Sequence, residues 1–357
     1  MSLYGDGPRV QTATPVPLGH GITGTAAALR QPIRVPNVDL DPRYVRCVHD
    51  LEMHSELVVP LIFKDRLVGV LDLESVEYDA FRSRHEQLLS TLASSLAIAV
   101  ENARLYGMLR EDEQRLDKDL TTARELQKQL LPKRTPWFPG LQLAVASEPA
   151  KHLGGDFHDF LPYGKHRLAI AVGDVAGKAT SAALYGALAI GTLREFAVQD
   201  CLAPARTLAD MNTKLHQLGV DNRFVAMAFG VYDRTARKLT LANSGLPHPF
   251  LLQNGEPRKI EVGGVPLGLL PDRSYEQVEL VLSAGDAVVI SSDGIEESLN
   301  REGEEFGTQR VVATLRRLAA GSAQEIAEGL LEAVQTYSGT PEPSDDRTVV
   351  VLKATAD

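Results

Sequence analysis

The sequence predicts an α+β fold for the larger part of the chain, and three observations support this. From Trp137 onward, short apolar runs alternate with Gly, Asp and Pro, as is typical of strands separated by turns. Longer segments with apolar residues at helical spacing fall in two pairs and do not alternate with the strands. Strands and helices segregated in this way favour two mainly antiparallel sheets with helices outside. The expected strands are 141–146, 168–172, 224–232, 238–242, 249–252, 278–282, 287–290 and 348–352, and the expected helices are 181–198, 203–218, 308–318 and 323–337.

Length and composition indicate a globular protein of two domains and a connector. The chain has 357 residues, of which 44% are hydrophobic and 24% charged. Its formal net charge of −10 disfavours a nucleic-acid partner. No apolar run approaches the length of a membrane span, and the first residues do not look like a signal peptide. The two cysteines, Cys47 and Cys201, lack ligand-like spacing, so we expect a cytoplasmic protein.

The N-terminal part, 1–105, has the pattern of a small α/β domain. Small residues at helical spacing predict a helix over 19–30, followed by a short strand over 32–38. Two apolar runs, 56–63 and 67–73, are separated by three polar residues, which is the signature of a hairpin. Leucines at helical spacing then begin after Phe81.

This order of elements resembles the C-terminal two-thirds of a GAF domain, a sensor module that binds small molecules or proteins. The resemblance includes the runs Ser-Glu-Leu-Val-Val-Pro-Leu at 55–61 and Val-Gly-Val-Leu-Asp-Leu at 68–73. The first helix and strands of such a domain have no counterpart, so either the chain begins inside the domain or the module is degenerate. We therefore assign no sensor residue.

A linker helix is expected over 106–134, ahead of a catalytic domain over 135–357. The segment 101–131 lacks Pro, and a Leu or Ala recurs at every seventh residue from Leu109 to Leu130. Pro132 ends the pattern. The apolar seam favours a homodimer through this helix, and packing on the helix's own domain is the alternative.

Four Asp residues are expected at strand ends, each beside a Gly or a second carboxylate. Taken singly, an Asp-Gly pair at a strand end is typical of an ordinary turn. Four in one domain indicate more, because carboxylates that separate strands bring to one point repel one another unless cations lie between them. Ligation by oxygen alone, without Cys or His, favours Mn²⁺ or Mg²⁺. The four residues are Asp156, Asp174, Asp293 and Asp345.

Six motifs resemble, in order, those of the metal-dependent PPM-type serine/threonine phosphatases, and the stage II sporulation E branch fits best. The resemblance covers 137–354 and implies an αββα sandwich; the segment 124–132 also looks like the sequence that precedes such domains. The motifs are Gly-Gly-Asp-Phe-His-Asp at 154–159, Gly-Asp-Val-Ala-Gly at 173–177, Asn-Ser-Gly at 243–245, Pro-Leu-Gly at 266–268, Ser-Asp-Gly-Ile-Glu-Glu at 292–297 and Asp-Asp-Arg-Thr at 345–348.

The resemblance implies a role for each of the four carboxylates. Asp174 would bridge two ions, Mn²⁺ or Mg²⁺. Asp156 and the carbonyl of Val175 would bind one ion, and Asp293 and Asp345 the other. These four carboxylates are thereby the expected catalytic residues.

Five other positions qualify this expectation. Asp159 and Asp346 are expected to hold metal-bound waters or a weaker third ion. Lys178 and Leu246 stand where this branch often has His, and Ala176 stands where eukaryotic relatives have a His that protonates the leaving group. We therefore expect tuned rather than absent activity, with a modest kcat.

Such a site suits hydrolysis of a phosphomonoester. Two close cations neutralise the phosphate and lower the pKa of a bridging water, so no covalent phosphoenzyme is needed. The sequence has no nucleophile elbow, no P-loop and no Cys-x₅-Arg motif. The resemblance further implies a phosphoserine or phosphothreonine substrate on an anti-sigma-factor antagonist of the STAS type, with regulation by the sensor domain.

Two other functions compete with this one. Gly-Gly-Asp-Phe at 154–157 also occurs in diguanylate cyclases, but there it lies midway through the domain, and the three later acidic motifs would have no role. The stronger rival is a catalytically weak or inactive module that binds a partner.

Overall fold

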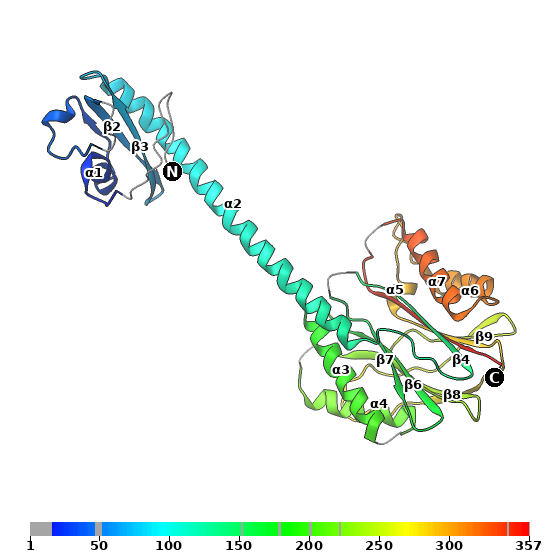
Figure 1. Ribbon diagram of the computed structural model, residues 1–357. Helices are drawn as coiled ribbons and strands as arrows, with labels where there is room; N and C mark the ends of the chain where they lie inside the picture. The colour runs from blue at the N-terminus through cyan, green and yellow to red at the C-terminus, as the bar shows by residue number, and fades with distance from the viewer. Residues whose placement is uncertain are drawn as a thin grey trace. The chain divides into compact units, whose positions relative to one another are not determined.

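The computed structural model describes residues 16–46, 52–150, 153–177, 180–199, 202–220, 223–340 and 343–356. The chain divides into two units, 1–116 and 117–357, and the helix α2, Ser83–Leu130, belongs to both (Figure 1). The predicted end of the linker helix before Pro132 is confirmed. The boundaries expected at 105 and 134 stay predictions. Cys47, Lys178 and Cys201 lie outside the described residues.

The N-terminal unit contains a three-stranded antiparallel sheet in the order β1-β2-β3. Because alternate side chains of a strand point to opposite faces, the central strand packs on both sides. Val58 contacts the helix α1, whereas Leu57 and Val59 contact the start of α2. The predicted hairpin is confirmed. The elements before α2 are α1 Gly21–Leu29, β1 Ile33–Val35, a 3₁₀ helix Val38–Leu40, β2 Ser55–Phe63 and β3 Arg66–Ser75.

The C-terminal unit contains two five-stranded antiparallel sheets, which confirms the predicted α+β sandwich. We call the sheet ordered β11-β8-β7-β6-β5 the first sheet, and the sheet ordered β10-β9-β12-β13-β4 the second sheet. The strands are β4 Leu141–Glu148, β5 Phe157–Pro162, β6 Arg167–Val175, β7 Val225–Asp233, β8 Lys238–Ser244, β9 Phe250–Gln253, β10 Glu256–Lys259, β11 Gln277–Val281, β12 Ala287–Ser291 and β13 Arg347–Ala354.

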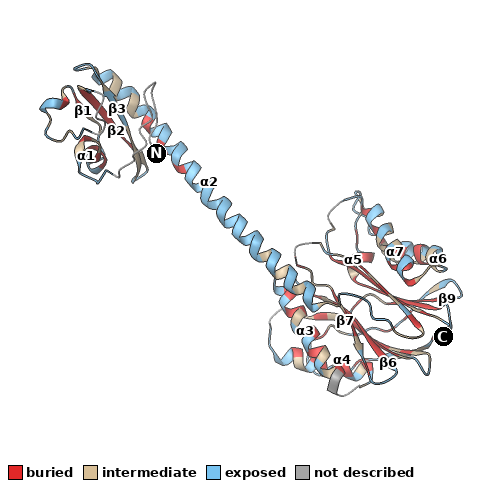
Figure 2. Ribbon diagram, viewed as in Figure 1, coloured by how far each residue is buried: buried red, intermediate tan, exposed pale blue. Residues whose placement is uncertain are grey.

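Helices cover the outer face of each sheet (Figure 1). The helices α3, Thr180–Gln199, and α4, Pro204–Gln217, pack on the first sheet. The helices α6, Gly307–Leu318, and α7, Ala323–Ser338, pack on the second sheet. A third apolar layer fills the space between the sheets, so both strand layers are buried (Figure 2). Among the described residues, no helix combines the length and apolar character needed to cross a membrane.

Among the described residues of the C-terminal unit, two strands and one short helix were not predicted. Residues 157–162 form β5 although they begin in an acidic motif and end at Pro162. The polar strand β10 lies at an edge of the second sheet, where Pro257 is tolerated because an edge strand needs fewer ladder donors. The helix α5, Asp293–Glu296, is a single turn that starts at one of the predicted site residues.

Candidate active site

Sheet register brings the first two acidic motifs together. The strands β5 and β6 are neighbours in the first sheet, and Phe157 pairs with Gly173. Asp156 immediately precedes β5, and Asp174 is the residue after Gly173. The two carboxylates therefore come from adjacent strand ends. The Coulombic repulsion between them contributes to raising the pKa of Asp156.

The other two acidic motifs meet at an end of the second sheet. The strands β12 and β13 are neighbours, with Ser291 paired to Val349. Beyond this pair, the Ser292 N–H donates to the Thr348 carbonyl at 3.0 Å, and the Thr348 N–H donates to the Ser292 hydroxyl at 3.0 Å. These bonds fix the chain where Asp293 starts α5 and where Asp345 approaches β13.

Asp156 lies close to residues of both sheets. Burial raises its pKa most, and the hydroxyls of Ser292 and Thr348, which both belong to the second-sheet side, partly oppose that rise. Its Oδ2 is buried and has no hydrogen-bond partner within the described part of the chain. A buried carboxylate oxygen without a donor is costly unless a cation occupies that side of the group. The geometry therefore fits a metal ligand better than a turn residue.

Burial and repulsion between neighbours raise the pKa values of three of these carboxylates. Burial, followed by repulsion from Asp293 and Asp345, raises the pKa of Asp174 to about 7. Burial is also the largest cause that raises the pKa of Asp156 well above its ordinary value and raises the pKa of Asp293. Groups that perturb one another in this way form one cluster. Asp174 thus interacts electrostatically with each of the other three predicted carboxylates.

The donor set fits divalent cations, although the side chains are not gathered to ligand distance. Within the described ranges, no three His, Cys, Asp or Glu side chains have the spacing of a formed metal site. Gly155 leaves room for two of the expected ligands: a Cβ on Gly155 would lie 2.8 Å from Asp174 Oδ1 and 2.9 Å from the Val175 carbonyl oxygen.

Asp346 and Asp159 are engaged by the protein itself. Asp346 accepts hydrogen bonds from the N–H groups of Ala150 at 2.8 Å and Gly155 at 2.6 Å, so it shapes the first acidic motif. Asp159 is only 3% exposed and pairs with Arg194, whose Nε lies 2.7 Å from its Oδ2. The expectation that Asp159 holds metal-bound water is therefore not supported.

The end of α2 touches the first acidic motif. Gln127 Nε2 donates to the Gly154 carbonyl at 2.7 Å, and the Gly154 N–H donates to Gln127 Oε1 at 3.3 Å. Arg194 donates both to Asp159 and to the Leu130 carbonyl, the latter at 2.7 Å. Sequence reasoning missed Gln127 because its neighbour lies 27 positions away. A cavity of about 270 Å³ lies beside it, lined by Arg124, Gln127, Lys128, Leu131, Ser147, Pro149, Gly154, Asp156 and Asp346.

Leu246 has a clear structural role. It is 6% exposed and belongs to the apolar layer between the sheets. Asn243 holds its backbone: Asn243 Nδ2 donates to the Leu246 carbonyl at 2.9 Å, and the Leu246 N–H donates to Asn243 Oδ1 at 3.1 Å. The Asn-Ser-Gly motif therefore shapes a turn, and Leu246 contributes to the core instead of to catalysis.

Two family profiles match the chain. The profile of stage II sporulation protein E matches residues 164–355, and the profile of the GAF domain matches residues 2–101. The first begins after the Gly-Gly-Asp-Phe motif and includes the other three acidic motifs.

Individual relatives agree with these profiles. The phosphoserine phosphatase RsbU of Bacillus subtilis is 25% identical over 296 residues, which are 79% of this chain and 86% of RsbU. The PP2C domain of SiaA from Pseudomonas aeruginosa superposes with a TM-score of 0.61 at 21% identity, covering 68% of this chain and 98% of that domain. A structure of RsbU and RsbW domains from Mycobacterium tuberculosis gives a TM-score of 0.56 at 24% identity, covering 64% of each chain. At these identities the structural matches establish the PP2C-type fold of the C-terminal unit.

Proposed function

We propose, from the premise that the chain belongs to the stage II sporulation protein E family, that it removes phosphate from phosphoserine or phosphothreonine on a signalling protein. The enzyme class is protein serine/threonine phosphatase, since the fold is of the PP2C type and the relative RsbU is a phosphoserine phosphatase. The observation that carries the proposal is the convergence of four strand-end carboxylates from two sheets, with Asp156 Oδ2 buried and unpaired among the described residues.

We assign the metal ligands as expected from the sequence. Asp174, Asp156 and the Val175 carbonyl would hold one divalent cation, and Asp174, Asp293 and Asp345 a second. Two such cations, Mn²⁺ or Mg²⁺, would neutralise the phosphate and supply an activated water. The support is the mutual effect of these carboxylates on their pKa values.

The chain's own residues then have distinct tasks. Asp346 holds the Gly155 backbone with its carboxylate, and thereby places Asp156. Ser292 ties the start of α5 to β13. Ala176 brings no proton donor beside Asp174, so the leaving group must take its proton from solvent or from the substrate's surroundings. That absence is the reason to expect a modest kcat.

We propose a small phosphoprotein substrate, an anti-sigma-factor antagonist of the STAS type. The support is the similarity to RsbU over most of both chains. An Asp345→Asn variant, which keeps the ligands assigned to the other cation, should retain affinity for the phosphorylated partner while turning it over poorly, so it serves as a trap. The assignment would be supported if the trap recovers a phosphorylated STAS protein and does not recover the same protein without its phosphate.

We further propose that α2 regulates the site and joins two copies of the chain. Gln127 and the Leu130 carbonyl near its end contact Gly154 and Arg194, so a shift of this turn reaches the first acidic motif. On the same helix, Leu109 and Leu116 are 56% and 61% exposed, as a dimer seam requires. The GAF domain at the other end of α2 is the expected source of the signal.

The test is hydrolysis of a phosphoserine protein with and without chelator. We expect turnover that needs Mn²⁺ or Mg²⁺ and that falls below about a tenth in Asp174→Asn, because that residue alone serves both ions. Turnover that survives chelation would overturn the metal assignment. Lack of turnover with intact binding of the phosphoprotein would favour the partner-binding module instead.

A further inference from the structure

Arg347 is a buried cation that directly follows Asp345 and Asp346 in the fourth acidic motif. Its side chain is 2% exposed, although arginine is almost never fully buried unless it is paired. Its Nε donates to the Ser298 hydroxyl at 2.9 Å, and a terminal nitrogen donates to Glu148 Oε2 at 3.0 Å. Glu148 is also its register partner on β4. One guanidinium therefore connects β13, β4 and the segment that follows α5.

The contact with Ser298 leads to Asp293. The Ser298 hydroxyl donates to the Gly294 carbonyl at 2.6 Å, in the short helix that Asp293 begins. Gly294 in turn lies against the backbone of Asp346, since a Cβ on Gly294 would be 2.0 Å from the Asp346 carbonyl oxygen. The turn carrying Asp293 is thus held between Ser298 and the segment carrying Asp345 and Asp346.

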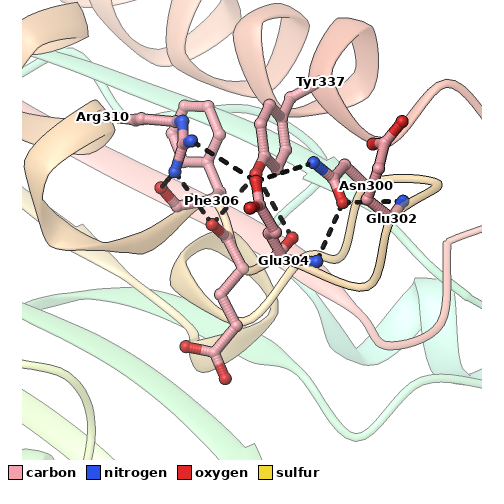
Figure 3. Close-up of polar contacts among 7 residues, drawn as sticks. Asn300, Glu302, Glu304, Phe306, Arg310 and Tyr337 are labelled. Atoms are coloured by element: carbon pink, nitrogen blue, oxygen red, sulfur yellow. Dashed lines mark hydrogen bonds and ion pairs between the residues drawn. The ribbon is translucent and has the colours of Figure 1, made fainter.

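The far side of Ser298 is anchored separately. The Phe306 N–H donates to the Ser298 carbonyl at 2.8 Å, and the Phe306 ring packs edge-on against Tyr337 at 5.3 Å. Tyr337 donates its hydroxyl to the carbonyls of Glu304 and Glu305, while Arg310 donates to the carbonyls of Glu305 and Phe306 (Figure 3). Ser298 is therefore a fixed point, and Arg347 connects the fourth acidic motif to it.

We propose that Arg347 is a positioning residue that fixes the separation of Asp293 and Asp345, the two ligands assigned to one cation; this rests on the proposed function. Asp293 and Asp345 carry like charges, so the pair resists close approach. A buried arginine with two fixed partners opposes that spreading without touching substrate. Partners that orient ligands in this way commonly change metal affinity about 10- to 100-fold when removed.

A merely structural arginine would behave differently. Its loss would lower the melting temperature and leave metal affinity unchanged in the molecules that stay folded. Lys353 is the matched control, because it lies at the other end of β13 and donates to the carbonyls of Ala319 and Gly321. Removing its ammonium cuts two partly buried contacts at the end of β13 that lies away from the acidic residues.

The experiment is calorimetric titration of the metal-free full chain with Mn²⁺, together with melting temperatures and turnover as a function of Mn²⁺. The variants are Arg347→Met, Arg347→Lys, Ser298→Ala and Lys353→Met, with Asp293→Asn as the reference that loses one site. We expect Arg347→Met and Ser298→Ala to weaken the same Mn²⁺ site at least about tenfold. Arg347→Lys should retain part of the Mn²⁺ affinity that Arg347→Met loses. The turnover of Arg347→Met and Ser298→Ala should recover at high Mn²⁺. Lys353→Met should melt lower with unchanged Mn²⁺ affinity.

If Arg347→Met does not fold, Ser298→Ala decides, since it removes only one hydroxyl. Wild-type Mn²⁺ affinity in both Ser298→Ala and Arg347→Lys would overturn this inference while the proposed function stands. A wild-type chain that neither binds Mn²⁺ nor hydrolyses phosphoserine would overturn the proposed function, and this inference with it.

Discussion

Gly155 and Asp174 are in contact across adjacent strand ends: a Cβ placed on Gly155 would lie 2.8 Å from Asp174 Oδ1. Real Cβ atoms do not come this close to another heavy atom, so only glycine leaves room for the carboxylate there. The residue before Asp156 therefore determines how closely the first two acidic motifs can approach. Gly155, the second Gly of Gly-Gly-Asp-Phe, therefore shapes the candidate metal site as Asp156 does.

Gly155→Ala should reduce metal-dependent turnover at least about tenfold, because the added methyl displaces the Asp174 carboxylate. The fold should survive, since the displaced group borders the cluster and not the apolar core. Gly191→Ala is the control: it lies in α3, and outside that helix's own backbone no atom of the described residues lies within 4 Å of its added Cβ, so it should keep full turnover. Turnover with Mn²⁺ and a melting curve check both variants. Equal turnover in the two variants would show that catalysis does not need the space that Gly155 leaves for the Asp174 carboxylate.

The metal-free protein should lose stability as pH rises. Asp174 has its pKa raised to about 7 by burial and by the neighbouring Asp293 and Asp345, so the folded state binds more protons than the unfolded state between about pH 4 and pH 7. The penalty is absent below the ordinary pKa and complete above the raised one. In chelator, Asp174→Asn should therefore melt higher than wild type near pH 8, with the difference vanishing near pH 4. A difference independent of pH would contradict the raised pKa.

Asp293→Asn and Asp345→Asn should each lose one cation while the fold survives. Removing one charge from a repelling cluster relieves repulsion, so the metal-free variants should melt no lower than wild type. Their turnover should need far more Mn²⁺. Calorimetry in chelator-treated protein measures both quantities. Unfolding of either variant with unchanged metal affinity would assign that residue a structural role.

The fold was predictable where apolar periodicity decided it. The two sheets, the four long helices of the C-terminal unit and the hairpin of the N-terminal unit were all expected from spacing. The strands β5 and β10 were not, because the first begins in a polar motif and the second is a polar edge strand containing Pro257. In both, the neighbouring strand and not the local sequence selects the extended conformation.

The candidate site divides in the same way. Asp174, Asp293 and Asp345 could be named because each stands at the end of a strand that the sequence shows, and Asp156 because of its Gly-Gly-Asp-Phe motif. Their non-local partners could not, since Gln127 meets Gly154, and Arg194 meets Asp159, only after folding. Asp159 is an example of a partner that the sequence does not show. Its motif suggested a role near the metals, whereas its buried carboxylate pairs with Arg194 of α3.

Gln127→Ala should lower turnover. It removes both hydrogen bonds to Gly154, at 2.7 and 3.3 Å, and so frees the backbone that leads to Asp156. We expect a several-fold loss of kcat with little change in the melting temperature, because the contact is only partly buried. Gln129→Ala, two positions along on the exposed part of the same helix, is the control. Steady-state turnover at saturating Mn²⁺ measures it. If both variants behave like wild type, the end of α2 does not act on the site.

Leu116→Asp tests whether α2 joins two chains. Leu116 is 61% exposed, so a charge there leaves the isolated chain intact but places a carboxylate where a partner helix would pack. We expect weaker dimerisation in sedimentation, and a changed kcat in the same sample if dimer contacts control the site. Metal affinity should change only if the switch acts by assembling the ligands.

Thr121→Asp provides the matched control for that variant. It adds the same charge to α2 five positions along, away from the seven-residue repeat that contains Leu109 and Leu116, so it should leave the dimer and its turnover unchanged. A Leu116→Asp protein that stays dimeric with wild-type turnover would make α2 a tether and remove the helix from the regulatory proposal. A Leu116→Asp protein that becomes monomeric with unchanged turnover would separate the two claims: α2 would form the dimer, and catalysis would not depend on it.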